Sequence, residues 1–299
     1  MTEPRLARAA STEPLVIDAH GRHAQAVHFT KDGRLLVSVG QDGRVRLWSV
    51  PGFSPAAVFE GHKNSVNTIS FSADETLLAT GSTDGTVRVW SFPDGRALRV
   101  LDKQLSAVFS PKADQLATVS ATGEAVLWDA RTGERIVSIA APDKRTFSLA
   151  FAPDGRRLLI GGSGAIHRFA LPSGVKEGEM RGHSVAVGCL RVSPDGKTLA
   201  STGGDGQLRL WSTKDWSETL RVKIGGTGVL QLAFSPKGNS VTVAADRLIQ
   251  SFAVKDGRVV ERIDLPLKGI YGVAISPDGK YLANAAADGK VRVWERRPK

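Results

Sequence analysis

The sequence predicts an all-β protein made of seven repeats, because two markers recur in register along the chain. An aromatic residue closes each repeat at intervals of 38 to 42 residues, and a turn sequence such as Pro-Asp-Gly separates the first two runs of each repeat. The aromatic residues are Trp48, Trp90, Trp128, Phe169, Trp211, Phe252 and Trp294. Four short strands in a period of about 40 to 45 residues are typical of the blades of a β-propeller.

The clearest repeat spans residues 61–90. Residues 66–71 and 86–90 alternate between apolar and polar, residues 76–80 form an apolar run, and Asp84-Gly85 lies in the second turn. Period-2 alternation with Asp-Gly between the runs indicates β-hairpins. Because one small sheet cannot bury both of its faces, each repeat needs neighbours of its own kind.

The repeats occupy residues 13–295, so we expect a single domain with a disordered tail at 1–12 and a basic C-terminal tail at 296–299. Residues 15–18 fall where the outermost strand of a blade falls, while the last repeat stops one strand short, near Trp294. We therefore expect the N-terminal strand to complete the last blade. Closure of the ring in this way would remove an unpaired sheet edge, which is an aggregation liability.

These repeats resemble the WD-repeat family of β-propellers over nearly the whole chain. The resemblance rests on Gly-His pairs at 61–62 and 182–183, on the Asp-Gly turns and on the closing Trp; the Trp-Asp pair itself occurs only at Trp128-Asp129. The resemblance implies a single seven-bladed propeller of four-stranded antiparallel blades. It also implies a scaffold that binds protein partners.

Three repeats carry a polar set at matching offsets, in which the His precedes the Trp by 28 positions and the Asp by 22. The sets are His20, Ser38, Asp42 and Trp48; His62, Thr80, Asp84 and Trp90; and His183, Ser201, Asp205 and Trp211. His, Ser and Asp could form a nucleophilic triad, but one active site does not need three copies. The resemblance implies instead a chain that ties the strands of a blade together, and a buried indole N–H needs such an acceptor.

The other four repeats depart from this pattern. The third has Thr122 where the Asp belongs, and the seventh has Asn284 at the Ser/Thr position. The fourth and sixth repeats close with Phe, although the sixth is interpreted as keeping Thr242 and Asp246. Because phenylalanine has no N–H, losing the polar chain with the Trp is self-consistent.

Composition limits the function classes. The formal net charge is +10, yet no basic run is interleaved with aromatic residues, so nucleic-acid binding is kept as an alternative. The single cysteine excludes an internal disulfide. No apolar run reaches the roughly 18 residues of a membrane helix, and residues 1–12 lack a signal-peptide core. We therefore expect a cytoplasmic protein. We also expect it to be monomeric on its own.

Neither a metal nor a cofactor is predicted. His20, His23 and His28 are close in sequence but no cysteine or acidic cluster joins them, and the glycine-rich residues 225–228 open no helix. The inner strands are mostly small or apolar, so an enzyme with its site in the central channel is a second alternative. Trp216 lies outside the repeat pattern and either caps its own blade or anchors a partner.

The main hypothesis is a non-catalytic scaffold. In the WD-repeat family the loops before the innermost strands open on one face, and here these loops are basic. These loops form the rim of that face. The partner-binding residues predicted on this rim are Arg22, His23, Lys63, Lys103, Lys144, Arg145, Lys268 and Tyr271. An acidic or phosphorylated peptide would fit such a surface.

Overall fold

The computed structural model describes residues 13–112, 114–140, 148–224, 231–266 and 269–296. The predicted tail at 1–12 and residues 297–299 of the C-terminal tail lie outside the described residues. All regular structure in the described ranges is β-strand. Within them no helix is long and apolar enough to cross a membrane.

The first complete sheet shows the plan of a repeat. Its antiparallel order is β2-β3-β4-β5, formed by Ala24–Phe29, Leu35–Gly40, Val45–Ser49 and Pro55–Phe59. The second and third strands are almost wholly buried, whereas the outermost strand is largely exposed. Each repeat therefore buries its middle strands between neighbouring sheets and exposes its fourth strand at the outer edge of the molecule.

Three further sheets follow the same order. They consist of β6 (Val66–Phe71), β7 (Leu77–Ser82), β8 (Thr86–Ser91) and β9 (Ala97–Asp102); β10 (Ser106–Phe109), β11 (Gln115–Val119), β12 (Ala125–Asp129) and β13 (Arg135–Ile139); and β21 (Gln231–Phe234), β22 (Ser240–Ala245), β23 (Leu248–Ala253) and β24 (Val259–Asp264).

The fourth and fifth repeats share one seven-stranded sheet, which the sequence did not predict. Its strands are β14 (Ser148–Phe151), β15 (Arg157–Gly161), β16 (Ser163–Ala170), β17 (Lys176–Val192), β18 (Thr198–Gly203), β19 (Gln207–Ser212) and β20 (Glu218–Lys223). The first part of the 17-residue β17 pairs with β16 and its last part pairs with β18. One strand is thus the outermost strand of the fourth repeat and the innermost strand of the fifth.

The first strand of the chain belongs to the same sheet as the last strand. The order is β1-β27-β26-β25, formed by Leu15–Asp18, Lys290–Glu295, Tyr281–Ala286 and Ile270–Ile275. β1 is antiparallel to β27, with Leu15 opposite Val293 and Asp18 opposite Lys290. The two ends of the repeat region therefore meet in one four-stranded sheet.

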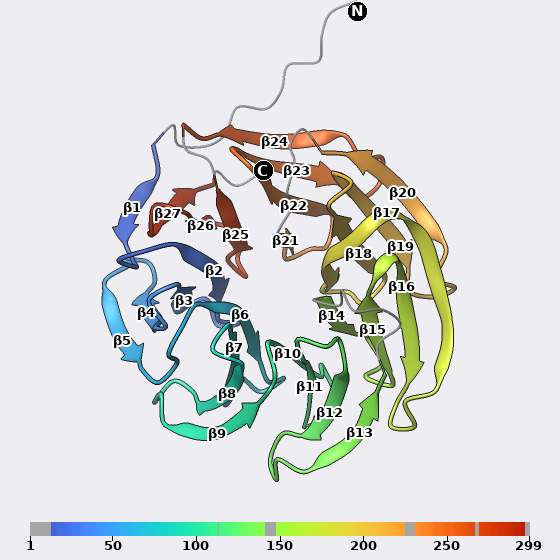
Figure 1. The fold of residues 1–299 in the computed structure, drawn as a ribbon. Coiled ribbons are helices and arrows are strands. Elements are labelled where there is room, and N and C mark those ends of the chain that lie inside the picture. Colours follow the sequence, from blue (N-terminus) through green and yellow to red (C-terminus); the bar gives the residue numbers. More distant parts are fainter. Residues whose placement is uncertain (1–12, 113, 141–147, 225–230, 267–268, 297–299) are drawn as a thin grey trace, which may run out of the picture.

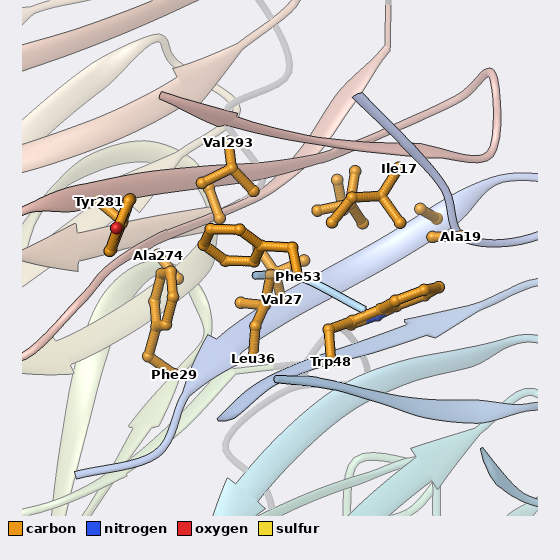
Figure 2. Packing of buried hydrophobic residues seen from close by; sticks show 14 residues of the cluster. Ile17, Ala19, Val27, Phe29, Leu36, Trp48, Phe53, Ala274, Tyr281 and Val293 are labelled. Carbon is orange, nitrogen blue, oxygen red and sulfur yellow. The ribbon is translucent and has the colours of Figure 1, made fainter. Parts of the chain in front are cut away.

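The sheets surround a common centre, with their innermost strands nearest to it (Figure 1). Consecutive innermost strands contact each other from β2 through β6, β10, β14, β17, β21 and β25, and β25 contacts β2. The core is divided into clusters between neighbouring sheets. Figure 2 shows the cluster between the last and first sheets, where Phe53 meets Tyr281 edge to face at 5.2 Å and Phe29 packs near Ala274.

Candidate functional site

A buried hydrogen-bonded chain links the polar set of the first repeat. Trp48 Nε1–H donates to Ser38 Oγ at 2.9 Å, and Ser38 Oγ lies 3.0 Å from His20 Nε2. His20 Nδ1 lies 2.8 Å from Asp42 Oδ1. Because the ionised Asp42 can only accept, His20 Nδ1–H donates to it, which leaves Nε2 of the neutral ring to accept from the Ser38 hydroxyl. The chain runs from β4 through β3 to the segment between β1 and β2.

The same geometry recurs in the second and fifth repeats. The distances are 2.8 Å from Trp90 Nε1 to Thr80 Oγ1, 2.9 Å from Thr80 Oγ1 to His62 Nε2 and 2.9 Å from His62 Nδ1 to Asp84 Oδ2. They are 2.9 Å from Trp211 Nε1 to Ser201 Oγ, 2.8 Å from Ser201 Oγ to His183 Nε2 and 3.0 Å from His183 Nδ1 to Asp205 Oδ2.

The charge states follow from burial and from these bonds. Burial lowers the pKa of His20, His62 and His183, against the opposing effect of the partner carboxylates. Burial alone would raise the pKa of Asp42, but hydrogen bonds from His20 and Arg46 outweigh it and hold that pKa well below its usual range. Each chain therefore holds a neutral imidazole and an ionised carboxylate at neutral pH.

The hydroxyl groups of these chains have no access to a substrate. Ser38, Thr80 and Ser201 are each 0% exposed. Each hydroxyl oxygen already accepts an indole N–H. A nucleophile must reach an electrophilic atom, and here the oxygen is enclosed in the middle of a sheet. The geometry therefore favours a strand-linking role over nucleophilic chemistry.

Gln104 replaces the histidine in the third repeat, and the sequence pattern missed it. Trp128 Nε1–H donates to Thr118 Oγ1 at 2.8 Å, and Thr118 Oγ1–H donates to Gln104 Oε1 at 2.7 Å. Thr122 bonds Ser120 instead, at 2.8 Å. The loop before β10 is shorter, so Gln104 precedes its Trp by 24 positions where His62 precedes its own by 28. A search that allowed for this shortening would have found the amide.

Two shortened hairpins place an apolar residue at the acceptor position of the repeats that close with Phe. Trp90 stands opposite Leu78, 12 positions earlier, whereas Phe252 stands opposite Val241, 11 positions earlier. Shifting the pairing by one residue turns the neighbouring side chains to the other face. Val243 therefore occupies the place of Thr80, and the assignment of Thr242 to that place is wrong. Thr242 bonds Ser251 at 2.7 Å instead.

The fourth repeat has the same shortening, with Phe169 opposite Leu158 and Ile160 at the acceptor position. The seventh repeat keeps the longer hairpin, with Trp294 opposite Leu282. Its Asn284 is 0% exposed, and neither polar atom of its side chain has a hydrogen-bond partner among the described residues. The Asp288 side chain accepts from Arg292 instead of from a histidine.

The histidines considered for zinc lie in different environments. His20 belongs to the buried chain, and the His23 ring lies tilted against that of Tyr271, with the ring centroids 5.5 Å apart. His28 lies farther along β2, with its ring 5.3 Å from that of Phe71. In the described ranges, no three His, Cys, Asp or Glu side chains are grouped to hold a metal ion.

The predicted rim residues that the structure describes lie next to the innermost strands. Arg22, Lys63 and Lys103 are exposed in the loops before β2, β6 and β10. His23 and Tyr271 form the ring pair described above, which joins the first and last sheets at their starts. Lys144, Arg145 and Lys268 lie outside the described residues.

The family is decided by comparison with known proteins. Residues 12–49, 53–91, 174–212 and 264–295 match the family described as WD domain, G-beta repeat. The chain is a WD-repeat protein. The matched segments of this WD-repeat chain include all three complete His-Ser/Thr-Asp-Trp sets. The third, fourth and sixth repeats, where Gln104 or a shortened hairpin replaces the pattern, fall mainly in the unmatched stretches.

Several curated proteins resemble the WD-repeat chain over part of their length. The Gallus gallus serine-threonine kinase receptor-associated protein is 30% identical over 69% of this chain and 59% of its own length. The Oryza sativa subsp. japonica chromatin assembly factor 1 subunit FAS2 homolog is 29% identical over 50% of this chain and 33% of its own. The Xenopus laevis tRNA (guanine-N(7)-)-methyltransferase non-catalytic subunit wdr4 is 26% identical over 65% of this chain and 40% of its own length. The chain thus spans less than two thirds of each relative.

Trp216 of this WD-repeat chain packs into the core between the fourth and fifth repeats. It lies in the turn between β19 and β20 with φ +64° and contacts the cluster that contains Trp211. The Arg168 guanidinium lies 5.2 Å from the centre of its ring. These contacts favour the capping interpretation of Trp216 over a role as a partner anchor.

Proposed function

We propose that this WD-repeat chain is a single seven-bladed propeller over residues 13–295 that acts as a monomeric, non-catalytic scaffold for a protein partner. The β1–β27 pairing and the contact of β25 with β2 support closure of the ring. The names of the relatives, a receptor-associated protein, an assembly-factor subunit and a non-catalytic subunit, support a role beside other proteins.

We further propose that the partner is an acidic or phosphorylated peptide that binds the loop rim defined by Arg22, Lys63, Lys103, His23 and Tyr271. The observation that carries this proposal is the exposure of three cations in equivalent loops, with an aromatic pair that includes the residue after Arg22. Cations at such a rim attract an acidic partner and form charge-assisted hydrogen bonds with carboxylate or phosphate. The rings offer apolar contact area beside them.

The carboxylate in the turn beside Lys63, Asp84, does not compete for this cation, and Asp205 is held in the same way in the fifth repeat. The side chains of Asp84 and Asp205 are 7% and 4% exposed. Asp84 Oδ2 accepts from His62 and from the backbone N–H of Lys63 at 2.9 Å, which also orients the loop that carries Lys63. The buried polar chains therefore keep these acidic groups inside the blades while the lysine side chain points to solvent.

Charge reversal tests the rim. We expect Arg22→Glu, Lys63→Glu and Lys103→Glu together to weaken binding of a selected Asp/Glu-rich or phosphoserine peptide at least tenfold, measured by fluorescence anisotropy. The control carries Arg96→Glu, Lys237→Glu and Lys255→Glu, which change the net charge equally at exposed turns elsewhere. Equal losses in both variants would show a general charge effect and contradict the proposed site.

Truncation tests the proposed closure. Removing residues 1–12 leaves β1 intact, so we expect almost no change in the unfolding curve. Removing residues 1–19 takes the outermost strand from the last sheet and exposes the edge of β27, so we expect aggregation or loss of cooperative unfolding. Identical melting curves for the two truncations would rule out a role for β1 in closing the ring.

A further inference from the structure

A cavity of about 430 Å³ opens at the centre of the molecule, among the innermost strands β2, β17, β21 and β25. Three of these strands lie around the centre in Figure 1, namely β2, β21 and β25. The lining is mostly apolar, and it includes the prolines of the turns that follow β17, β21 and β25. The rim loops precede the innermost strands, so this cavity lies toward the opposite face. Its volume is within the roughly 300–1,000 Å³ of small-molecule sites.

The repeat register explains why the cavity is there. His28, Arg191, Ala233 and Ala274 occupy one equivalent position, two residues before the Ser or Thr that begins the following turn. The neighbouring strands β21 and β25 place alanine at this position, which leaves space. β17 and β2 contact them on either side and supply Arg191 and His28. Two missing side chains thus make the volume, and two large polar side chains flank it.

The polar groups of the cavity are suited to an anion. Arg191 is exposed and makes one hydrogen bond in the described structure, from Nη1 to the backbone oxygen of Leu190 at 3.0 Å, so most of its N–H groups can bind a ligand. The described lining contains no carboxylate. Lys31 also lines the cavity and adds positive charge, although its ammonium donates to Ala73 O at 2.5 Å.

His28 adds a hydrogen-bond acceptor. Its Nδ1–H donates to Phe29 O at 2.7 Å, which leaves Nε2 as the acceptor of the neutral ring. Desolvation by the innermost strands around the ring lowers the pKa of His28, although the residue itself is exposed toward the cavity, and the charges of Arg191 and Lys31 act in the same direction. The ring is therefore neutral at neutral pH and can accept a hydroxyl or amide N–H from a ligand.

We infer that this cavity binds a small organic acid, with its carboxylate on Arg191 and a short apolar body over Ala233 and Ala274. A guanidinium matches a carboxylate with two parallel hydrogen bonds. One free guanidinium suits a carboxylate monoanion better than a phosphate, because the Lys31 ammonium is already held by Ala73. The side chains of Phe234 and Ile275 supply apolar contact on the strands that carry the alanines.

Titration with small probes tests the ligand class. Benzoate, phenylacetate and hexanoate are added to the full chain, with benzamide as the uncharged match of benzoate and inorganic phosphate as an anion without an apolar body. At least one acid is expected to bind saturably and to shift backbone amide resonances of β2, β17, β21 and β25. Benzamide and phosphate are expected to bind at least tenfold more weakly. Equal binding of either comparator, or no saturable binding of any acid, overturns the inference.

Variants separate the cavity from the general surface. Arg191→Met is expected to weaken acid binding at least tenfold, whereas Arg221→Met, which removes an exposed arginine from β20 in the same repeat, is expected to change it less than twofold. Ala233→Leu fills the cavity without changing charge and is expected to abolish binding with an unchanged melting temperature. If the Arg191→Met variant does not fold, acid binding by the Ala233→Leu variant alone tests the inference. Wild-type affinity in a folded Ala233→Leu variant overturns the inference.

Discussion

The second and sixth repeats share a four-stranded plan but treat their closing aromatic residue differently. In the second, the Trp90 indole needs an acceptor and finds Thr80, which leads on to His62 and Asp84. In the sixth, Phe252 needs none, and the apolar Val243 stands at the acceptor position. Both sheets form. The polar chain is therefore required by the buried indole N–H and not by the blade itself.

The polar groups of the sixth repeat connect different parts of the chain. Ser251 Oγ bonds both Thr242 Oγ1, at 2.7 Å, and Glu261 Oε2, at 3.1 Å. Glu261 also accepts from Arg296 Nη2 at 2.8 Å, in the segment after β27. The second repeat uses its polar chain to tie its own strands together, whereas the sixth uses its polar groups to tie itself to the seventh.

Removing the indole donor should have the largest effect. We expect Trp90→Phe to destabilise the fold by about 1–3 kcal/mol in denaturant unfolding, because buried Thr80 loses a partner and the chain to His62 is disturbed. Phe252→Trp is the matched control and should give no gain, since Val243 cannot accept a hydrogen bond. If Trp90→Phe left the free energy of unfolding unchanged, or if Phe252→Trp raised it, the basis of the comparison would be removed.

Acid should weaken the repeats that contain the histidines. Burial lowers the pKa of His62, so the unfolded chain, with a pKa near 6.5, takes up the proton first. The stability due to the neutral ring is complete above about pH 6.5 and is lost as the pH falls below it. The slope is up to about 1.4 kcal/mol per pH unit for each proton.

The variant that sharpens this prediction is His62→Gln, which copies the amide of the third repeat and cannot titrate in this range. Urea unfolding at pH 6.5, 6.0, 5.5 and 5.0 should show that the free energy of unfolding falls less steeply with pH for His62→Gln than for the wild type. Parallel pH profiles would mean that the buried His62 does not contribute to acid sensitivity.

A polar pair introduced into the sixth repeat should be coupled. If register alone decides the chemistry, Val243→Thr and Phe252→Trp together should be more stable than the sum of the two single changes by about 1 kcal/mol. The shortened hairpin still places residue 243 two positions beyond the residue opposite the aromatic, as in the second repeat. A double-mutant cycle measures this coupling, and strict additivity would show that the hairpin also misplaces the side chains.

Repairing the seventh repeat should have the smallest effect. Asn284 is opposite Arg292, the same register that places Thr80 opposite Arg88. We expect Asn284→Thr to stabilise the fold by about 0.5–1.5 kcal/mol, because a hydroxyl at this position can accept from the Trp294 indole. Asn284→Val is the control without the hydroxyl. If the Asn284→Val variant melts at a higher temperature than the Asn284→Thr variant, the gain comes from removing the unpaired amide and not from the new acceptor.

Much of this architecture is readable from the sequence, because turn chemistry and alternation are local signals. The spacing of 28 and 22 positions was enough to group His62 with Trp90 and Asp84, since hairpins of equal length conserve offsets. The same arithmetic failed for Thr242, where the turn is one residue shorter, and for Gln104, where the preceding loop is shorter. Offsets counted along a chain hold only while every intervening turn keeps its length.

The cavity was harder to foresee than the blades. Arg191 and His28 are far apart in sequence, and each alternates with buried residues like any strand residue exposed on one face. Only the arrangement of β17, β21, β25 and β2 brings them to the two sides of paired alanines. A comparison of the equivalent inner-strand position across all repeats is the signal that could have found them.

The unbroken strand β17 has a mechanical consequence. At the other described junctions a loop lies between the outermost strand of one repeat and the innermost strand of the next, but β17 runs as one strand from Lys176 to Val192, and its pairing with β16 shifts register between Arg181 and Ala186. The fourth and fifth repeats are therefore joined in one sheet. We therefore expect relative motion of neighbouring repeats mainly at the looped junctions, and we expect the fourth and fifth repeats to move together.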